Sequence, residues 1–516
     1  MAMSSPAGAA DELHHRNLPS TWLPDWDSAR GRWIEFTVLA AIVASVFLVY
    51  LTQITPGEDS TSTDWVLYVT QARNIVDGHP FGESLYVYQP EARMYGASTY
   101  PPGYSLLLAP VYAAFGVNLK AFKVVSDVVL ALALVPVYWC VRRHLGTPAG
   151  WLLTLALGFS YPFIALQNHL SSDGLFLLLS FWTLAVLLRI YGERKDETAP
   201  WLWGAAAGLL AAAACITRPI GFALILAMGA YEIVRRRRIT RFAMAFGAVF
   251  TPVIVLDHLL AHSVASSAEQ FVLSIPAMVR HLAAYATLFS YLFSNPLSHG
   301  LRYVLWAAAT ALAIAGMLAT LRAVNPIPLL YSAAMLGVLG VYWIPNPRYL
   351  APLLPIYLIY AGLGGQWLVG RLPRGMSRLA LAVGVAAVLA VPAINAVTLK
   401  PDTDSLITAP AFQSLSGYMR AHTSGRELTV FWNARVLALA SDRPSSAYPR
   451  VVADGSESTA ESVLRYLDRV RPAYVVLDDG FASDERRLAE AIAMAPARFP
   501  MVYQNERFRL MRYVAP

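Results

Sequence analysis

Long apolar stretches recur along the chain, and short charged or proline-containing loops separate them. A helix of about 20 apolar residues is long enough to cross the hydrocarbon core of a bilayer. On this criterion we predict eleven spans, at residues 33–53, 121–141, 148–167, 173–191, 201–216, 219–234, 242–261, 302–321, 326–344, 349–370 and 378–397. Only 14% of the residues are charged, whereas soluble domains carry roughly 25%. The predicted fold class is a polytopic α-helical membrane protein, in which the short pair 201–216 and 219–234 could alternatively form half-deep helices.

Basic residues mark one side of the predicted membrane. They occupy short loops on the side of the N-terminus: Arg142, Arg143, Lys195, Arg235–Arg238, Arg322, Arg371, Arg374 and Arg378. Because short cytoplasmic loops carry an excess of Lys and Arg, we expect a cytoplasmic N-terminus. The long connections 54–120 and 262–301 then face outward. This clustering accounts for the net charge of +7, so we expect membrane lipids and no nucleic acid among the partners.

Three regions follow from the changes in composition. Residues 1–32 are polar and form a predicted cytoplasmic segment, 33–397 form the transmembrane domain, and 398–516 are as charged as a soluble domain. No small-residue cleavage site follows the first apolar run, which predicts a retained anchor. Within the last region, ELTVFW, AYVVLDD and MVYQNERFRLMRYV read as strands, and helical patterns cover about 411–421, 458–470 and 482–495. We expect a small outward-facing α/β domain with a structural or acceptor-docking role, since no glycine-rich loop follows AYVVLDD.

One amphipathic segment follows directly on the first span. It reads DSTSTDWVLYVTQARNIVDGHPF, and a helix that begins at Asp64 would place Tyr68 and Ala72 on the same side as its carboxylate. Such a helix is suited to lie on the membrane surface rather than to cross it. Asp64 could be only a helix N-cap, and Asp59 only a solvated loop charge.

Ionisable and sulfur-containing side chains also occur inside apolar segments. Asp127 and Asp257 are costly there, which suggests a function or a partner. Asp257 precedes His258, and His262 follows one turn later, so a divalent cation stays open as a cofactor. A metal site usually needs three or more converging ligands, and we assign no metal ligand. The two cysteines, Cys140 and Cys215, lie in apolar runs and read as packing residues.

The order of the motifs carries more information than any one of them. Six follow one another: DWVLYVTQARNIVDGHPF, YPPGYSLLLAPVYAAFG, VPVYWCVRRHLG, SSDGLFLLLSFWTL, GLLAAAACITRPIGFALIL and NPRYLAPLLPIYLIYAG. In this order the chain resembles the GT-C glycosyltransferases that use polyprenyl-phosphate sugars, most closely the protein O-mannosyltransferase and lipid A aminoarabinose transferase group. The resemblance covers about residues 33–370, and an outward C-terminal domain is typical of the group.

The resemblance implies roles for particular residues. Asp64 matches the acidic residue of the first outward loop and would be the general base, with Tyr68 beside it in the spacing D-x-x-x-Y. Arg218 and Arg348 would hold the lipid phosphate, the neighbouring Tyr349 would bind substrate, and Asp173 would line the cavity. For the arginines the alternative is interfacial snorkelling, and for Asp173 it is an N-cap, with Ser171 or Ser172 as competing caps. Relatives of the aminoarabinose type usually have lysine where this chain has Tyr100, and often a second acidic residue where it has Trp65, so the donor sugar stays open.

The predicted function is transfer of one sugar from a polyprenyl-phosphate donor to an acceptor hydroxyl or phosphate, with inversion, on the outer face of the membrane. The acceptor would be a lipid, a glycan or a protein. Abundant Ala and Arg favour a bacterium, and hence the inner membrane with a periplasmic active site. The alternative is a lipid-linked sugar transporter or flippase, for which internal repeats would be expected.

Overall fold

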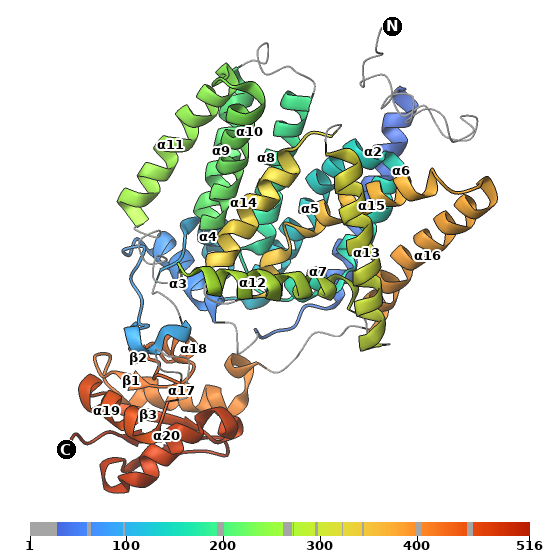
Figure 1. The fold of residues 1–516 in the computed structure, drawn as a ribbon. Helices are drawn as coiled ribbons and strands as arrows, with labels where there is room; N and C mark the ends of the chain where they lie inside the picture. The colour runs from blue at the N-terminus through green and yellow to red at the C-terminus, as the bar shows by residue number, and fades with distance from the viewer. Residues whose placement is uncertain are drawn as a thin grey trace, which may run out of the picture.

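The structure, a computed structural model, consists of a helical part and a smaller C-terminal domain built around a sheet (Figure 1). It describes residues 28–58, 63–95, 99–192, 201–261, 271, 273–294, 298–321, 324–342, 345–398, 405–450 and 458–516. The predicted fold class, a polytopic helical protein with a C-terminal α/β domain, is confirmed.

All eleven predicted spans fall on helices. Six of these helices are long and apolar enough to cross a membrane: α2 (Ala29–Thr52), α5 (Leu119–Leu145), α8 (Asp173–Gly192), α11 (Arg241–Ala261), α13 (His299–Thr320) and α16 (Arg374–Thr398). Four are shorter: α9 (Trp201–Thr217), α10 (Phe222–Tyr231), α14 (Ile327–Val341) and α15 (Leu354–Val369). Within the described residues the helices support six spans, or seven with a bent pair, so the predicted count of eleven is not confirmed.

Two predicted spans are interrupted. The segment 148–167 forms α6 (Thr147–Gly158) and α7 (Tyr161–Gln167), which meet at 53°. The segment 219–234 is a 3-10 turn (η2, Pro219–Gly221), then α10, then a π-helical turn (η3, Glu232–Arg236). Proline disfavours helical geometry in the residue before it, and Arg218 is accordingly extended (φ −148°, ψ 129°). This break turns Arg218 away from the axis of α9.

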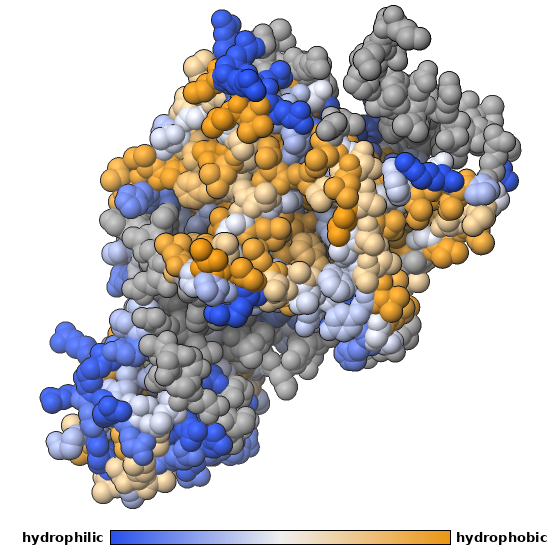
Figure 2. All heavy atoms as spheres, in the orientation of Figure 1, coloured by the Kyte–Doolittle hydropathy of each residue, from blue (hydrophilic) through white to orange (hydrophobic). Residues whose placement is uncertain are grey.

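Apolar side chains cover much of the helical part, while the C-terminal domain is mostly hydrophilic on the face in view (Figure 2). Leu256 on α11, Leu318 on α13 and Leu379 on α16 are 55%, 67% and 66% exposed. Large exposed apolar areas of this kind mark contact with lipid or another protein. The helices therefore present the surface expected of a multi-pass membrane protein.

The first long connection forms α3 (Asp64–Asp77), a 3-10 turn (η1, Pro90–Tyr95) and α4 (Pro102–Phe115). The predicted helix does begin at Asp64, but it does not lie open on the membrane surface. Residues from Trp65 to Ala72 are all buried, because α3 packs against α4 and against α18 (Ala434–Ser441) of the C-terminal domain. The second connection contains α12 (Ile275–Leu288) and η5 (Phe289–Phe293), and a further turn, η6 (Pro347–Leu350), precedes α15.

The C-terminal domain has a five-stranded sheet of order β2-β1-β3-β5-β4. β1 (Thr429–Val430) is parallel to β2 (Ser445–Ser446) and β3 (Tyr474–Asp478), and β5 (Phe508–Arg512) is antiparallel to β3 and to β4 (Met501–Gln504). The predicted helices are α17 (Pro410–His422), α19 (Ala460–Val470) and α20 (Ala482–Met494), and short turns lie at η7 (Leu406–Thr408), η8 (Asp479–Phe481) and η9 (Pro496–Arg498). Neither α18 nor β2 was predicted, because two serines carry no strand signal.

The C-terminal domain is joined to the first connection along several contacts. One buried hydrophobic cluster includes Trp65 and Tyr104 from the connection together with Phe412 and Leu415 from the domain. The backbone around Tyr86 pairs with Ser445 as an added parallel bridge at the edge of β2. Further contacts are the ion pair between Arg469 and Glu91 (2.7 Å) and two hydrogen bonds between Ser405 and the backbone of Glu58. These contacts hold the domain directly over the start of α3.

Candidate active site

Asp64 opens α3 but does not cap it. The N-cap residue is Thr63, which makes no side-chain cap bond, and Asp64 is the first residue of the helix. Its carboxylate is turned toward three other groups. Arg348 Nη2 donates to Oδ2 at 2.8 Å, Tyr100 Oη donates to Oδ1 at 2.8 Å, and Arg435 Nη1 lies 3.4 Å from the same Oδ1. The alternative of a simple helix cap therefore does not describe this carboxylate.

The charges around Asp64 decide its protonation. Burial alone would raise its pKa, but the guanidinium groups of Arg348 and Arg435 outweigh this effect and hold the pKa at about 2. Asp64 is thus ionised at neutral pH. The same burial raises the pKa of Tyr68 to about 12 and that of Tyr100 further, so both phenols are neutral hydrogen-bonding groups.

A second arginine lies next to this carboxylate network. The break between α9 and α10 places Arg218 in an ion pair with Asp173 at the start of α8. The ring of Tyr349 lies close to both arginines, with the guanidinium carbon of Arg218 at 5.2 Å from its centroid and that of Arg348 at 5.3 Å. Cations over an aromatic face are attracted by the ring quadrupole, so Tyr349 stabilises both positive charges.

Tyr68 connects the two halves of the site. Its hydroxyl hydrogen-bonds Ser172 Oγ at 3.0 Å, and Ser172 directly precedes Asp173. Its ring lies 5.2 Å from that of Tyr100, centroid to centroid. All six residues named from the sequence, Asp64, Tyr68, Asp173, Arg218, Arg348 and Tyr349, therefore lie in one contiguous cluster.

Two residues of the cluster were not predicted as site residues. Tyr100 stands where the resemblance would lead one to expect lysine, and its hydroxyl binds Asp64. Arg435 belongs to α18 and is 371 residues away from Asp64 in the chain, so no local pattern could have paired them. The positive charge at this corner of the site thus comes from the C-terminal domain.

Among the described residues of the cluster, guanidinium groups outnumber carboxylates. The guanidinium groups are Arg218, Arg348 and Arg435, and the carboxylates are Asp64 and Asp173. One positive charge is left over. That excess matches the single negative charge of a phosphodiester, which guanidinium groups bind through charge-assisted hydrogen bonds.

A separate cluster of polar side chains surrounds Lys123 on α5. Lys123 Nζ is 3.2 Å from Glu58 Oε2 and donates to Thr55 Oγ1 and Asn168 Oδ1 at 3.1 Å each. Asp127, one turn further along α5, is fully buried. Neither of its carboxylate oxygens has a hydrogen-bond partner in the described structure, and the nearby Lys123 is paired with Glu58.

Of the three residues around which a cation was expected, Asp257 and His258 lie on α11, and His262 lies outside the described residues. Within the ranges that the structure does describe, no group of three or more His, Cys, Asp or Glu side chains is placed to hold a metal ion.

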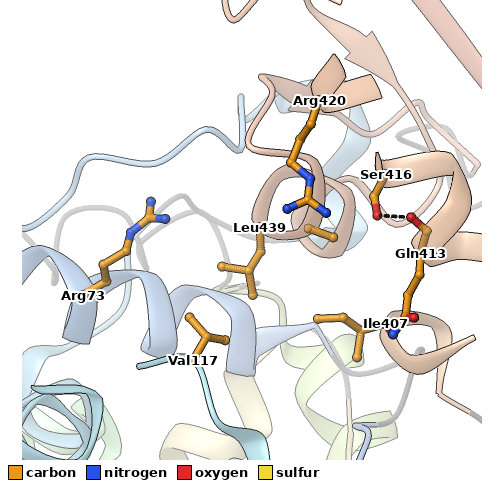
Figure 3. Close-up of a pocket in the computed structure, with 8 residues that line it drawn as sticks. Arg73, Val117, Ile407, Gln413, Ser416, Arg420 and Leu439 are labelled. Carbon is orange, nitrogen blue, oxygen red and sulfur yellow. Dashed lines mark hydrogen bonds between the residues drawn. The ribbon is translucent and has the colours of Figure 1, made fainter. Parts of the chain in front are cut away.

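An open pocket of about 360 Å³ lies where α3 meets the C-terminal domain (Figure 3). Arg73 enters it from the last part of α3, and Arg420 enters it from α17 on the other side. Leu439 and Ala440 of α18 form part of its lining. The same two helices contribute to the cluster around Asp64, since α3 carries Asp64 and α18 carries Arg435.

Comparison with known proteins identifies relatives of both sequence and fold. The family described as dolichyl-phosphate-mannose-protein mannosyltransferase matches residues 99–261. No curated protein sequence matches significantly. Among solved structures, ArnT from Cupriavidus metallidurans bound to undecaprenyl phosphate is 15% identical, with a TM-score of 0.57 over 95% of this chain and 99% of that chain.

Two further structures are similar. Archaeal oligosaccharyltransferase AglB from Archaeoglobus fulgidus, in complex with an inhibitory peptide and a dolichol-phosphate, is 11% identical, with a TM-score of 0.61 over 92% of this chain and 73% of that one. Arabinofuranosyltransferase AftD from Mycobacteria is 15% identical, with a TM-score of 0.57 over 94% of this chain and 40% of that one. The chain therefore has the fold of the GT-C membrane glycosyltransferases, which confirms the resemblance seen in the order of its motifs.

Proposed function

We propose that the chain transfers a single sugar from a polyprenyl-phosphate donor to an acceptor on the outer face of the membrane. The observation that carries the proposal is the ionised carboxylate of Asp64 bound to Arg348, within a cluster that has one excess positive charge. The fold supports the donor class, since ArnT was solved with undecaprenyl phosphate and AglB with a dolichol-phosphate.

The proposed reaction is a direct displacement. The acceptor hydroxyl oxygen attacks the anomeric carbon while Asp64 takes its proton, and the bond from that carbon to the phosphate oxygen breaks. The electron pair leaves with the lipid phosphate, and the configuration inverts. Arg348 and Arg218, with side chains 24% and 18% exposed, are accessible enough to stabilise the growing charge on the phosphate.

Donor binding would also make Asp64 a better base. With its pKa at about 2, the carboxylate is too weakly basic to take a hydroxyl proton efficiently. Arg348 is the leading cause that lowers this pKa. A donor phosphate that draws Arg348 to itself therefore raises the pKa of Asp64 when the reaction needs a base.

The acceptor would approach from the pocket between α3 and the C-terminal domain. Arg73 on α3 and Arg420 on α17 both line this pocket (Figure 3). Two guanidinium groups favour an acceptor that carries phosphate or carboxylate groups near its hydroxyl. We place this pocket and the active site in the periplasm of a bacterial inner membrane, with residues 33–397 as the catalytic domain and 398–516 as the domain that covers it.

The proposal is tested by incubating the purified protein in nanodiscs with undecaprenyl-phosphate sugars and an inner-membrane lipid and glycan extract. The expected result is a glycosylated product and an equivalent amount of undecaprenyl phosphate. A transporter would move the labelled donor across a vesicle membrane without releasing that lipid phosphate. Donor translocation without sugar transfer would therefore overturn the proposal.

A further inference from the structure

Arg435 is an unusual residue for the interior of a small domain. Its side chain is 1% exposed, and it lies in the first turn of α18, directly after β1. A positive charge at the N-terminal end of a helix is disfavoured by the helix dipole. Burial of a guanidinium is costly as well, unless it is paired. Stability of the domain alone therefore gives no reason for an arginine here.

Several contacts of Arg435 reach across to the first connection. Its Nη1 is 3.4 Å from Asp64 Oδ1, from the hydroxyl of Tyr100 and from Thr63 Oγ1. Its guanidinium carbon lies 5.0 Å from the ring centroid of Tyr86 and 5.5 Å from that of Tyr100. The guanidinium is thus fixed by two aromatic rings of the first connection and directed at Asp64.

The arginines around Asp64 differ in their freedom to move. Arg348 has a side chain 24% exposed and comes from the turn η6, whereas Arg435 is enclosed. A phosphate that enters the site can reach Arg348, but it cannot draw Arg435 out of its aromatic setting without separating the domain from α3. Once Arg348 has turned to the phosphate, Arg435 is the cation that stays on the carboxylate.

We propose that Arg435 is a positioning residue for sugar transfer, which holds the carboxylate of Asp64 in its orientation while Arg348 serves the donor phosphate. The C-terminal domain is then part of the catalytic centre and not only a cover. This inference rests on the proposed role of Asp64 as the base.

Docking of the domain sets the position of this guanidinium. The bridge between Tyr86 and Ser445 brings the first connection to the edge of β2, four residues beyond the end of α18. The ion pair of Arg469 with Glu91 ties α19 to the same connection, with side chains 51% and 46% exposed. Because Arg469 contributes to docking but does not touch Asp64, it offers a matched control.

The pH dependence follows from the groups that face Asp64. These are Arg348 from η6, Arg435 from α18, Tyr100 from the segment before α4, and Tyr68 and Arg218 at greater distance. Since Arg435 lowers the pKa of Asp64, its removal raises that pKa. Activity would then be lost at a higher pH on the acidic side, because the base is protonated earlier.

The experiment compares Arg435→Gln, Arg435→Lys, Arg469→Ala and Asp64→Asn in the full-length protein. Initial rates with an undecaprenyl-phosphate sugar give kcat, donor KM and the pH profile, and binding of undecaprenyl phosphate is measured separately. A misplaced catalytic group costs on the order of 100-fold, so we expect Arg435→Gln to lower kcat by about 10- to 100-fold. Donor KM and lipid-phosphate binding should change less than about threefold. Arg435→Lys should recover only part of kcat, because it restores the charge but not the planar group that lies against Tyr86 and Tyr100. Arg469→Ala should behave as wild type.

Other outcomes overturn the inference in distinct ways. Weaker undecaprenyl-phosphate binding at unchanged kcat would make Arg435 a phosphate ligand instead. An equal loss in Arg469→Ala, with the same melting temperature in both variants, would reduce Arg435 to a docking contact. If the pH–activity profile of Arg435→Gln is the same as that of the wild type on its acidic side, Arg435 does not act on Asp64. Full activity in Asp64→Asn would instead refute the proposed function, whatever Arg435 does.

Discussion

The replacement Asp64→Asn tests the centre of the proposed mechanism. Asparagine keeps the size of aspartate and one acceptor oxygen, so it can retain the hydrogen bond from Tyr100 or the one from Arg348, each 2.8 Å long in the structure. It removes the negative charge and with it the basicity. General-base catalysis contributes about 10²- to 10⁴-fold, so kcat should fall by that factor, which corresponds to about 3–5 kcal/mol in the activation free energy.

The change also has a cost in stability. It removes the negative charge that faces Arg435, whose side chain is only 1% exposed, so the free energy of unfolding should fall. The variant should bind undecaprenyl phosphate as tightly as the wild type or more tightly, because Arg348 no longer has to break an ion pair with residue 64 before it contacts the phosphate. The assays are sugar transfer at equal amounts of folded protein and lipid-phosphate binding by native mass spectrometry.

The matched control lies on the same helix. Asp77 ends α3, receives a hydrogen bond from Tyr112 at 3.4 Å and has no contact with the arginine cluster in the described structure. Asp77→Asn should leave kcat unchanged. If Asp64→Asn retains wild-type turnover, Asp64 is not the base and the reaction scheme is wrong.

Three further predictions concern the donor, the acceptor and the topology. Arg348→Ala should raise the donor KM at least tenfold. Arg348→Lys should raise it less, because lysine keeps the charge and loses only the bidentate geometry. If Arg348→Ala has the donor kinetics of the wild type, Arg348 is an interfacial anchor. Arg73→Glu and Arg420→Glu should raise the KM for an anionic acceptor and leave that for the donor unchanged, and a change in donor KM alone would contradict the proposed acceptor pocket. A reporter fused after Arg238 should be cytoplasmic and one after Lys400 periplasmic, and finding both on one side would refute the proposed orientation.

Local sequence patterns were sufficient to predict the positions of most helices and strands of this protein. The eleven predicted apolar segments fall on helices, and α3 begins at the predicted Asp64. The three predicted strand segments of the C-terminal domain contain β1, β3, β4 and β5. These features depend on periodicity and hydrophobicity within a window of some 20 residues, which the chain displays directly. The residues of the candidate site could be named from the sequence for another reason, since they lie in ordered motifs that resemble those of a known family.

Tertiary packing decided the rest. The 53° bend between α6 and α7 and the burial of α3 beneath α18 depend on what lies beside each helix. The same holds for Arg435, whose residue type and helical position carry no sign of a partner 371 residues away. An ion pair between two domains is fixed by how both backbones pack and by the desolvation that their contact imposes, and neither quantity exists until the chain has folded.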